Sequence, residues 1–347
     1  MSTLQVGLAI IGGLVLAGVV AHGAWTSRRS APRQADPQAP RVEPELGRQE
    51  PGFDPAGPGF DPEAAPLPLP PIEKKPSLDS LIDVIAPISL ESAVFGDAVL
   101  AAMPATRRVG SKPFALEGLN EVTQQWELPQ VGQRYSALQA GVQLANRSGA
   151  LNEIEYSEFV VKAQAFADAV GGTPEFPEML DEVARARELD GFASTHDAQL
   201  GVMLRARAAA WSPGYVHQCA ARLGFVPGAI PGRMVLPASQ PGQPPLLGLA
   251  FDAQAALAED LDQSALREVS LSLEVAHVDR HEQPFARMRE AAESLAATMD
   301  GLVTDDNGQP LSAQALDQIG AELEKLYDSL DARELSAGSI LARRLFS

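Results

Sequence analysis

An uninterrupted apolar run near the N-terminus most constrains what this chain can fold into. Residues 4–25 read LQVGLAIIGGLVLAGVVAHGAW and contain no Asp, Glu, Lys or Arg. As a helix rising about 1.5 Å per residue, this run spans roughly 30 Å, which is the thickness of the hydrocarbon core of a bilayer. The sequence therefore predicts a transmembrane helix, with residues 1–26 forming an N-terminal membrane anchor.

The flanking charges favour a retained anchor over a cleaved signal peptide. A signal peptide has basic residues before its apolar core, but residues 1–6 contain no Lys or Arg. The basic residues Arg28, Arg29 and Arg33 follow the run instead. By the positive-inside rule, the N-terminus faces out and everything after the helix faces the cytoplasm. A cleaved signal peptide and a buried core helix remain as alternatives.

The segment after the apolar run has the composition of a spacer. Between about residues 31 and 77 it is rich in Pro, Gln, Ala, Asp and Glu. Such a segment buries too little apolar surface to offset the entropy of ordering, so residues 27–77 are predicted to be a disordered linker. The motif PGFDP occurs at 51–55 and again at 58–62, as a docking motif or as low-complexity sequence. PLPLPP at 66–71 favours polyproline II.

Charge and cysteine content exclude several classes of function. The net charge is −18, and an acidic chain is poorly suited to phosphate backbones, so we expect no nucleic-acid partner. The single cysteine, Cys219, allows neither an internal disulfide nor a multi-cysteine metal site. This agrees with a reducing compartment.

A strand–loop–helix pattern occurs twice in the remaining sequence. Residues 269–275 alternate apolar and polar residues, as in a strand with one buried face, and an amphipathic helix follows at 285–300, ended by Gly301. Earlier, residues 138–144 alternate in the same way, and a helix follows at 156–170, ended by two glycines. The sequence separation is nearly the same for the strands and for the helices, which indicates an internal repeat.

The elements around these pairs also correspond. In the first copy we expect strands at 83–89, 113–118 and 123–128 and helices at 93–103 and 176–189; in the second, strands at 200–207, 233–236 and 245–251 and helices at 213–223 and 313–330. The sequence thus predicts two tandem α+β modules, 78–196 and 197–332, each an antiparallel sheet with helices on one face, followed by a C-terminal tail, 333–347. Two unrelated stretches of similar pattern are the alternative.

The second copy resembles a known family. Residues 267–330 give, in order, a strand, a polar loop, a helix, a short strand led by Gly301, the turn Asp305–Ser312 and a last helix. This order, together with the apolar start ending in HGAWTSRR and the Pro-rich spacer, resembles the ZipA family of cell-division proteins over about 1–75 and 200–330. Residues 80–195 depart from the pattern, because the family has a single such domain.

The resemblance implies a function and a site. The family role is an adaptor at the bacterial inner membrane that binds the C-terminal tail of FtsZ and tethers the division ring, with no catalysis and no cofactor. The groove positions carried onto this chain are Ala206, Arg233, Val235, Ala250, Asp252 and Ser272. Three of them are polar where large hydrophobes are expected, which favours weaker binding or a different peptide. The alternative is an anchored scaffold for another protein of the division machinery.

An enzyme or a metal site has little support in the sequence. His277, Asp279, His281 and Glu282 lie close together and could be zinc ligands or a solvated loop. Cys219 lies near His217 on a predicted helix, but at a spacing of two residues they do not face each other, so a buried thiol is expected rather than a nucleophile. Phosphate-binding glycine motifs are absent.

Overall fold

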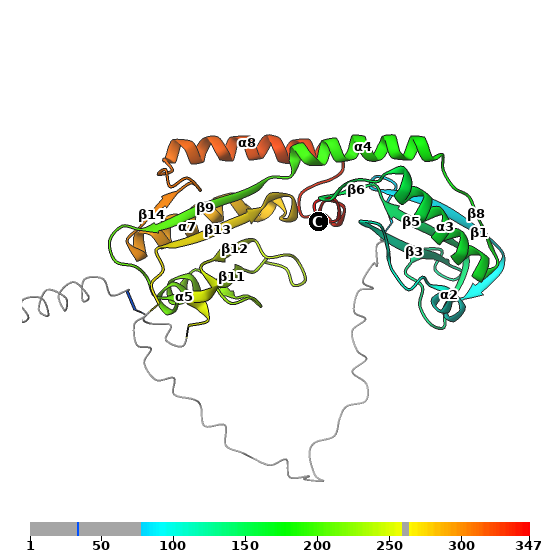
Figure 1. Ribbon diagram of the computed structural model, residues 1–347, viewed down its shortest axis with the longest axis horizontal. Helices are drawn as coiled ribbons and strands as arrows, with labels where there is room; N and C mark the ends of the chain where they lie inside the picture. Colours follow the sequence, from blue (N-terminus) through cyan, green and yellow to red (C-terminus); the bar gives the residue numbers. More distant parts are fainter. Residues whose placement is uncertain (1–32, 35–77, 259–263) are drawn as a thin grey trace, which may run out of the picture.

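Two six-stranded antiparallel β-sheets, each with its own helices, and a small two-stranded sheet lie within residues 33–34, 78–258 and 264–347, which the computed structural model describes (Figure 1). The predicted α+β class is therefore confirmed for this part of the chain. Among these residues, no helix combines the length and the apolar composition needed to cross a bilayer. The predicted anchor at 4–25 lies outside the described residues, as does the predicted linker 27–77 apart from Arg33 and Gln34.

The first unit contains a sheet in the order β2-β3-β5-β1-β8, with β4 paired to β3. Its elements are β1 (Asp83–Phe95), α2 (Gly96–Ala102), β2 (Arg108–Val109), β3 (Lys112–Asn120), β4 (Trp126–Glu127), β5 (Arg134–Gln143), β6 (Ala145–Asn146), β7 (Gly149–Ala150), α3 (Glu153–Val170), β8 (Gly172–Pro174) and α4 (Met179–His196). Helix α3 lies on one face of the sheet, which we call the inner face, and Phe159 of α3 packs against Phe114 of β3. The opposite face is the outer face.

The second unit contains a sheet in the order β10-β11-β12-β13-β9-β14. Its elements are β9 (Gln199–Ala206), α5 (Pro213–Arg222), β10 (Val226–Pro227), β11 (Arg233–Leu236), β12 (Leu247–Ala250), α6 (Ala253–Ala256), β13 (Glu268–Glu274), the 3₁₀ turns η1 (Val275–His277) and η2 (Arg280–Glu282), α7 (Pro284–Met299), β14 (Gly301–Thr304) and α8 (Ala313–Ala332). Helix α7 covers the inner face here, because Met288, Leu295 and Met299 bury their side chains against the sheet.

The two sheets share a strand order and a pairing register. In the first, β5 lies between β3 and β1, and Ala140 pairs with both Leu116 and Ala86. In the second, β13 lies between β12 and β9, and Leu271 pairs with both Leu249 and Val202. The strand after the main helix, β8 or β14, then pairs with β1 or β9. Residues of the two sheets can therefore be compared one for one.

Several predicted boundaries differ from the structure. The helix predicted at 93–103 starts later, because β1 continues pairing with β5 as far as Phe95. The strand predicted at 123–128 is reduced to β4, since Asn120 Oδ1 accepts hydrogen bonds from the N–H groups of Val122 and Thr123 and closes a turn there. The helix predicted at 176–189 is displaced to α4, and α7 ends at the left-handed residue Asp300 rather than at Gly301.

The C-terminal segment, predicted to be a tail, is folded. Residues 340–345 form α9 (Ile340–Leu345), whose N-cap Ser339 accepts a hydrogen bond from the N–H of Ala342. Ala342, Leu345 and Phe346 are buried in the core. In Figure 1 the C-terminus lies between the two units, beneath the line formed by α8 and α4.

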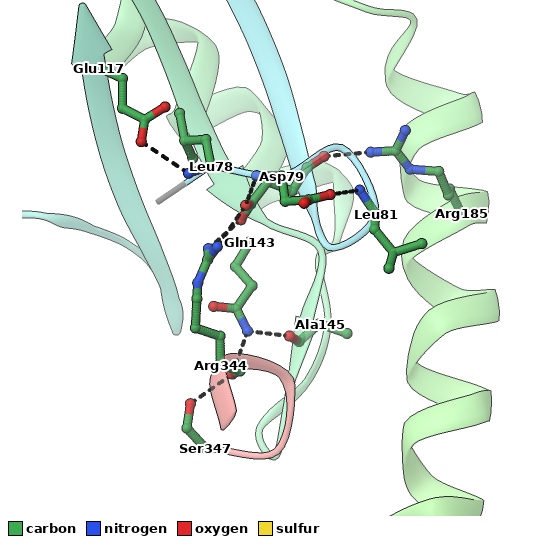
Figure 2. A network of polar contacts seen from close by, with 10 residues as sticks. Leu78, Asp79, Leu81, Glu117, Gln143, Ala145, Arg185, Arg344 and Ser347 are labelled. Carbon is green, nitrogen blue, oxygen red and sulfur yellow. Dashed lines mark hydrogen bonds and ion pairs between the residues drawn. The ribbon is translucent and has the colours of Figure 1, made fainter. Parts of the chain in front are cut away.

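Polar contacts of α9 connect the units. Arg344 makes two hydrogen bonds, of 2.6 and 3.0 Å, with the carboxylate of Asp83 on β1, and its carbonyl accepts from the side chain of Gln143 at 2.8 Å (Figure 2). Asp83 is fully buried, and burial raises its pKa while Arg344 opposes the shift. Outside α9, Arg147 of the first unit pairs with Asp197 at 2.8 Å and with Glu274 of β13 at 2.9 Å.

Candidate functional site: the outer face of the second sheet

Strand alternation decides which residues of the second sheet face outward. Met234, Leu249, Leu271 and Val202 point to the inner face and are buried. Their neighbours along each strand therefore point to the outer face. Those outward residues are Arg233 and Val235 on β11, Gly248 and Ala250 on β12, Glu268, Ser270 and Ser272 on β13, and Gly201, Met203 and Arg205 on β9.

Five of the six predicted site residues lie on this outer side, and one does not. Arg233 pairs with Ala250, and Val235 and Ser272 both pair with Gly248, so four of these positions are neighbours across three strands. Asp252 follows β12 at the same edge. Ala206 lies on the inner face, in step with Val202 and Leu204, and packs against the core.

Ala206 was misplaced by one residue, which moves a strand residue to the opposite face. The outward residues of β9 that take its place are Met203 and Arg205. The alternation of Leu200, Val202 and Leu204 in the sequence already contained this signal. Val303 of β14 pairs with Leu204 on the inner face, so Leu302 is a further outward residue that sequence reasoning missed.

Small side chains form the floor of the face. Gly248 lies directly beside Ser272, because a Cβ at Gly248 would be 2.6 Å from Ser272 Oγ and the serine side chain would have to rotate. Ser270 donates a hydrogen bond from Oγ to the carbonyl of Ala250 at 3.2 Å. A depression of about 420 Å³ lies here, lined in part by Met203, Ala250, Asp252 and Ser270. The floor is therefore flat enough for an extended chain to lie close to the sheet.

Charged residues surround the floor. Arg205 pairs with Glu268 at 3.1 Å, and Arg233 and Arg267 are exposed nearby. Asp252 caps α6 by accepting from the N–H of Gln254 at 2.8 Å, so its carboxylate has a local structural role. Asp306 Oδ1 lies on the same side of the sheet, 3.6 Å from where a Cβ of Gly201 would be, so three arginines stand near three carboxylates and the charges around the floor balance. The small floor residues suit an extended peptide with small apolar side chains.

The histidine–carboxylate motif lies elsewhere, beside a cavity of about 500 Å³ between the 238–246 hairpin loop, η1, η2 and Gly338. His277 Nδ1 lies 3.2 Å from Glu274 Oε2, and its Nε2 lies 3.0 Å from the carbonyl of Phe346. Glu282 is engaged by Ser239 at 2.7 Å and Arg287 at 3.3 Å. No group of three or more potential metal ligands lies together within residues 33–34, 78–258 and 264–347.

Cys219 and His217 do not form a catalytic pair. Cys219 is buried in α5, whereas His217 packs edge-on against Phe251 with ring centroids 5.5 Å apart. Burial lowers the pKa of His217. Both side chains therefore take part in packing.

Comparison with known proteins identifies part of the second unit. No curated protein sequence matches the chain. Residues 253–322 match the family model described as ZipA, C-terminal FtsZ-binding domain. The match covers α6, β13, α7, β14 and half of α8; it includes Ser272 but begins after the other five predicted site residues. The family consists of protein-binding domains rather than enzymes, and over residues 253–322 this chain is ZipA-like.

Proposed function

We propose that this protein is a cell-division adaptor that binds the C-terminal peptide of FtsZ on the outer face of its second sheet. The observation that carries the proposal is the match of residues 253–322 to the FtsZ-binding domain of ZipA. The open face formed by β9, β11, β12 and β13 supports it, because an extended peptide needs an accessible surface of this kind.

The membrane anchor belongs to the same proposal. The apolar run at 4–25 would cross the inner membrane once, with the N-terminus in the periplasm and both units in the cytoplasm. A peptide-binding unit attached in this way holds its partner at the membrane and raises the local concentration for binding. Other proteins of the division machinery are further candidate partners.

We also propose that the two units, 78–196 and 197–332, are copies of one ancestral module. The identical order of the four central strands and the matching register support this. The first copy has diverged in sequence, and the family match falls on the second copy alone.

The test is a titration of the full chain in detergent with a labelled FtsZ C-terminal peptide. Ser272→Glu places a carboxylate in the middle of the floor and should weaken binding at least tenfold. The matched control is Ser89→Glu, an exposed serine on the outer face of the first sheet, which should leave affinity unchanged. Equal affinities for both variants would place the site elsewhere. A fluorescent fusion should reach midcell with residues 1–26 and become diffuse without them.

A second candidate function is a scaffold for a different partner. Arg233, Asp252 and Ser272 stand where a deep apolar groove would have large side chains, and apolar anchors usually supply most of the binding energy. If the FtsZ peptide does not bind while the fusion still localises to midcell, this alternative is favoured.

A further inference from the structure

The outer faces of the two sheets differ in how they are covered. The shared register aligns Gly141 of β5 with Ser272 of β13, and Glu117 of β3 with Ala250 of β12. Ala250 and Ser272 belong to the proposed peptide-binding face. Gly141 and Glu117 are therefore the counterparts of these two residues on the first sheet.

Leu78 lies on both of these residues. A Cβ built on Gly141 would be 2.3 Å from Leu78 Cδ2, so the leucine side chain rests directly on the glycine. The backbone N–H of Leu78 donates to Glu117 Oε1 at 3.2 Å, and Gln139 donates to the other carboxylate oxygen at 2.8 Å. Leu78 is only 6% exposed and Glu117 is fully buried. Figure 2 shows Leu78 beside Glu117, just before the turn that leads into β1.

A tight turn holds Leu78 in this place. The N–H of Asp79 donates to Asp83 Oδ2 at 2.9 Å, and the carbonyl of Asp79 accepts from Ile82 and Asp83 at 3.1 and 2.8 Å. The turn reverses the chain, so the residue before it crosses the outer face while β1 continues in the sheet. Leu78 is therefore positioned by backbone hydrogen bonds as well as by packing.

In the part of the chain that the structure describes, no residue covers Ser272 as Leu78 covers Gly141. Helix α4 leads directly into β9, and its last residues occupy the sequence positions that correspond to the turn before β1. Ser272 is exposed, and the depression of about 420 Å³ begins at Ser270 and Ala250, its neighbours on the same face. The same position is thus covered on one sheet and open on the other.

We propose that Leu78 is a built-in ligand of the first sheet, so that each chain presents one open face for a partner peptide, on the second sheet. The proposal rests on the proposed function and adds a binding mode to it. An apolar side chain of the peptide lies over Ser272 as Leu78 lies over Gly141. The serine in place of glycine leaves less depth, which selects a small or flat apolar side chain.

Calorimetric titration of the full chain with the FtsZ C-terminal peptide tests the stoichiometry. The wild type should bind one peptide per chain. Leu78→Ser should bind two, because it removes the resident side chain. Gly141→Ser should also bind two, because its Cβ displaces Leu78 while the rest of the sheet keeps its residues. The control is Leu180→Ser, the same change at a leucine that is 63% exposed on α4, and it should stay at one.

Two results would overturn the proposal: two peptides bound by the wild type, or one peptide bound by both Leu78→Ser and Gly141→Ser. If the wild type binds no peptide, the proposed function fails, and amide hydrogen exchange decides the question about Leu78. In Gly141→Ser the amides of residues 78–83 should then exchange at least tenfold faster than in the wild type, with β13 unchanged. Unchanged exchange at 78–83 would show that Leu78 does not close the face.

Discussion

Histidine 217 packs edge-on against Phe251 in a half-buried site, and burial lowers its pKa from the ordinary value of 6.5. Because the unfolded chain binds the proton more readily, the free energy of unfolding falls as pH drops below about 6.5. His217→Phe keeps an aromatic ring and removes the titration. Denaturant unfolding at several pH values should show the wild type losing stability relative to this variant between pH 7 and pH 5. If the difference in the free energy of unfolding between the wild type and His217→Phe stays constant with pH, then His217 does not cause the loss of stability.

Asp83 and Arg344 form the ion pair that connects β1 to α9. Arg344→Met leaves a buried carboxylate without its cation and should lower the free energy of unfolding by about 3 kcal/mol. Asp83→Asn should also destabilise the protein, and the double variant should lose less than the sum of the two single losses. If the loss of unfolding free energy in the double variant equals the sum of the two single losses, Asp83 and Arg344 do not stabilise the protein through their interaction.

The same pair has a pH dependence of defined sign. The folded-state pKa of Asp83 is raised by burial, so the folded state favours the protonated carboxyl. The contribution of Asp83 to stability is therefore present at low pH and is lost as pH rises through its folded pKa. Without the guanidinium, Arg344→Met should show this loss more strongly than the wild type.

At the scale of elements, α9 depends on packing rather than on its own helix propensity. A helix of six residues is unstable alone, but Phe346 is 1% exposed and fixes it between the units. Phe346→Ala should cost about 3 kcal/mol in denaturant unfolding. Ile340→Ala, on the same helix at a residue that is 49% exposed, should cost much less. Equal effects would mean that α9 is held by its backbone contacts alone.

The sequence predicted the types of the long elements and the buried faces of the strands. It did not predict the short helix α9 or the contact of Arg33 with the second unit. Alternation at 138–144 and 269–275 gave the inner faces of β5 and β13, because one buried face imposes a period of two. Helix α9 is too short to show a helical period. Arg33 contacts the second unit through backbone hydrogen bonds, which any residue can make, so no side-chain pattern could indicate it.

The positions carried over from the resemblance lie on the outer face only where they agree with the alternation of the strand. Val235, Ala250 and Ser272 are on the outer face in both, and the structure brings them together. At Ala206 the aligned position conflicted with the alternation of β9, and the alternation was correct. Leu78 could not have been found, because its contact with Gly141 depends on the turn at 79–82.

At the scale of the molecule, α9 fixes the orientation of the two units. Without residues 339–347 the contacts of Arg344 and Phe346 are lost, and the remaining contacts between the units include the partly exposed ion pairs of Arg147 and Arg333, which contribute little. Spin labels at exposed Leu180 and Ile230, in a Cys219→Ala background, should show a single narrow distance in the full chain. The shortened chain should give a broad distribution, and a narrow one would assign the orientation to other contacts.

If residues 4–25 form the proposed anchor, the contact of Arg33 with the second unit limits how far that unit can move from the membrane. Its N–H donates to Ala210 at 2.7 Å, its carbonyl accepts from Ser212 at 2.8 Å, and its side chain pairs with Asp300 at 3.3 Å. Residues 27–33 span at most about 25 Å when fully extended, so this contact keeps the second unit close to the bilayer.

Energy transfer between a dye on the second unit and a lipid dye, measured in nanodiscs, tests this geometry. Arg33→Glu places a carboxylate opposite Asp300 and should release this contact. The energy transfer should then fall, because a flexible linker of this length allows a root-mean-square distance of roughly 40 Å between the membrane and the folded units. Lys325→Glu, a charge reversal at an exposed site on α8, should leave transfer unchanged. If Arg33→Glu behaves like that control, the whole linker is the tether and Arg33 does not limit its reach.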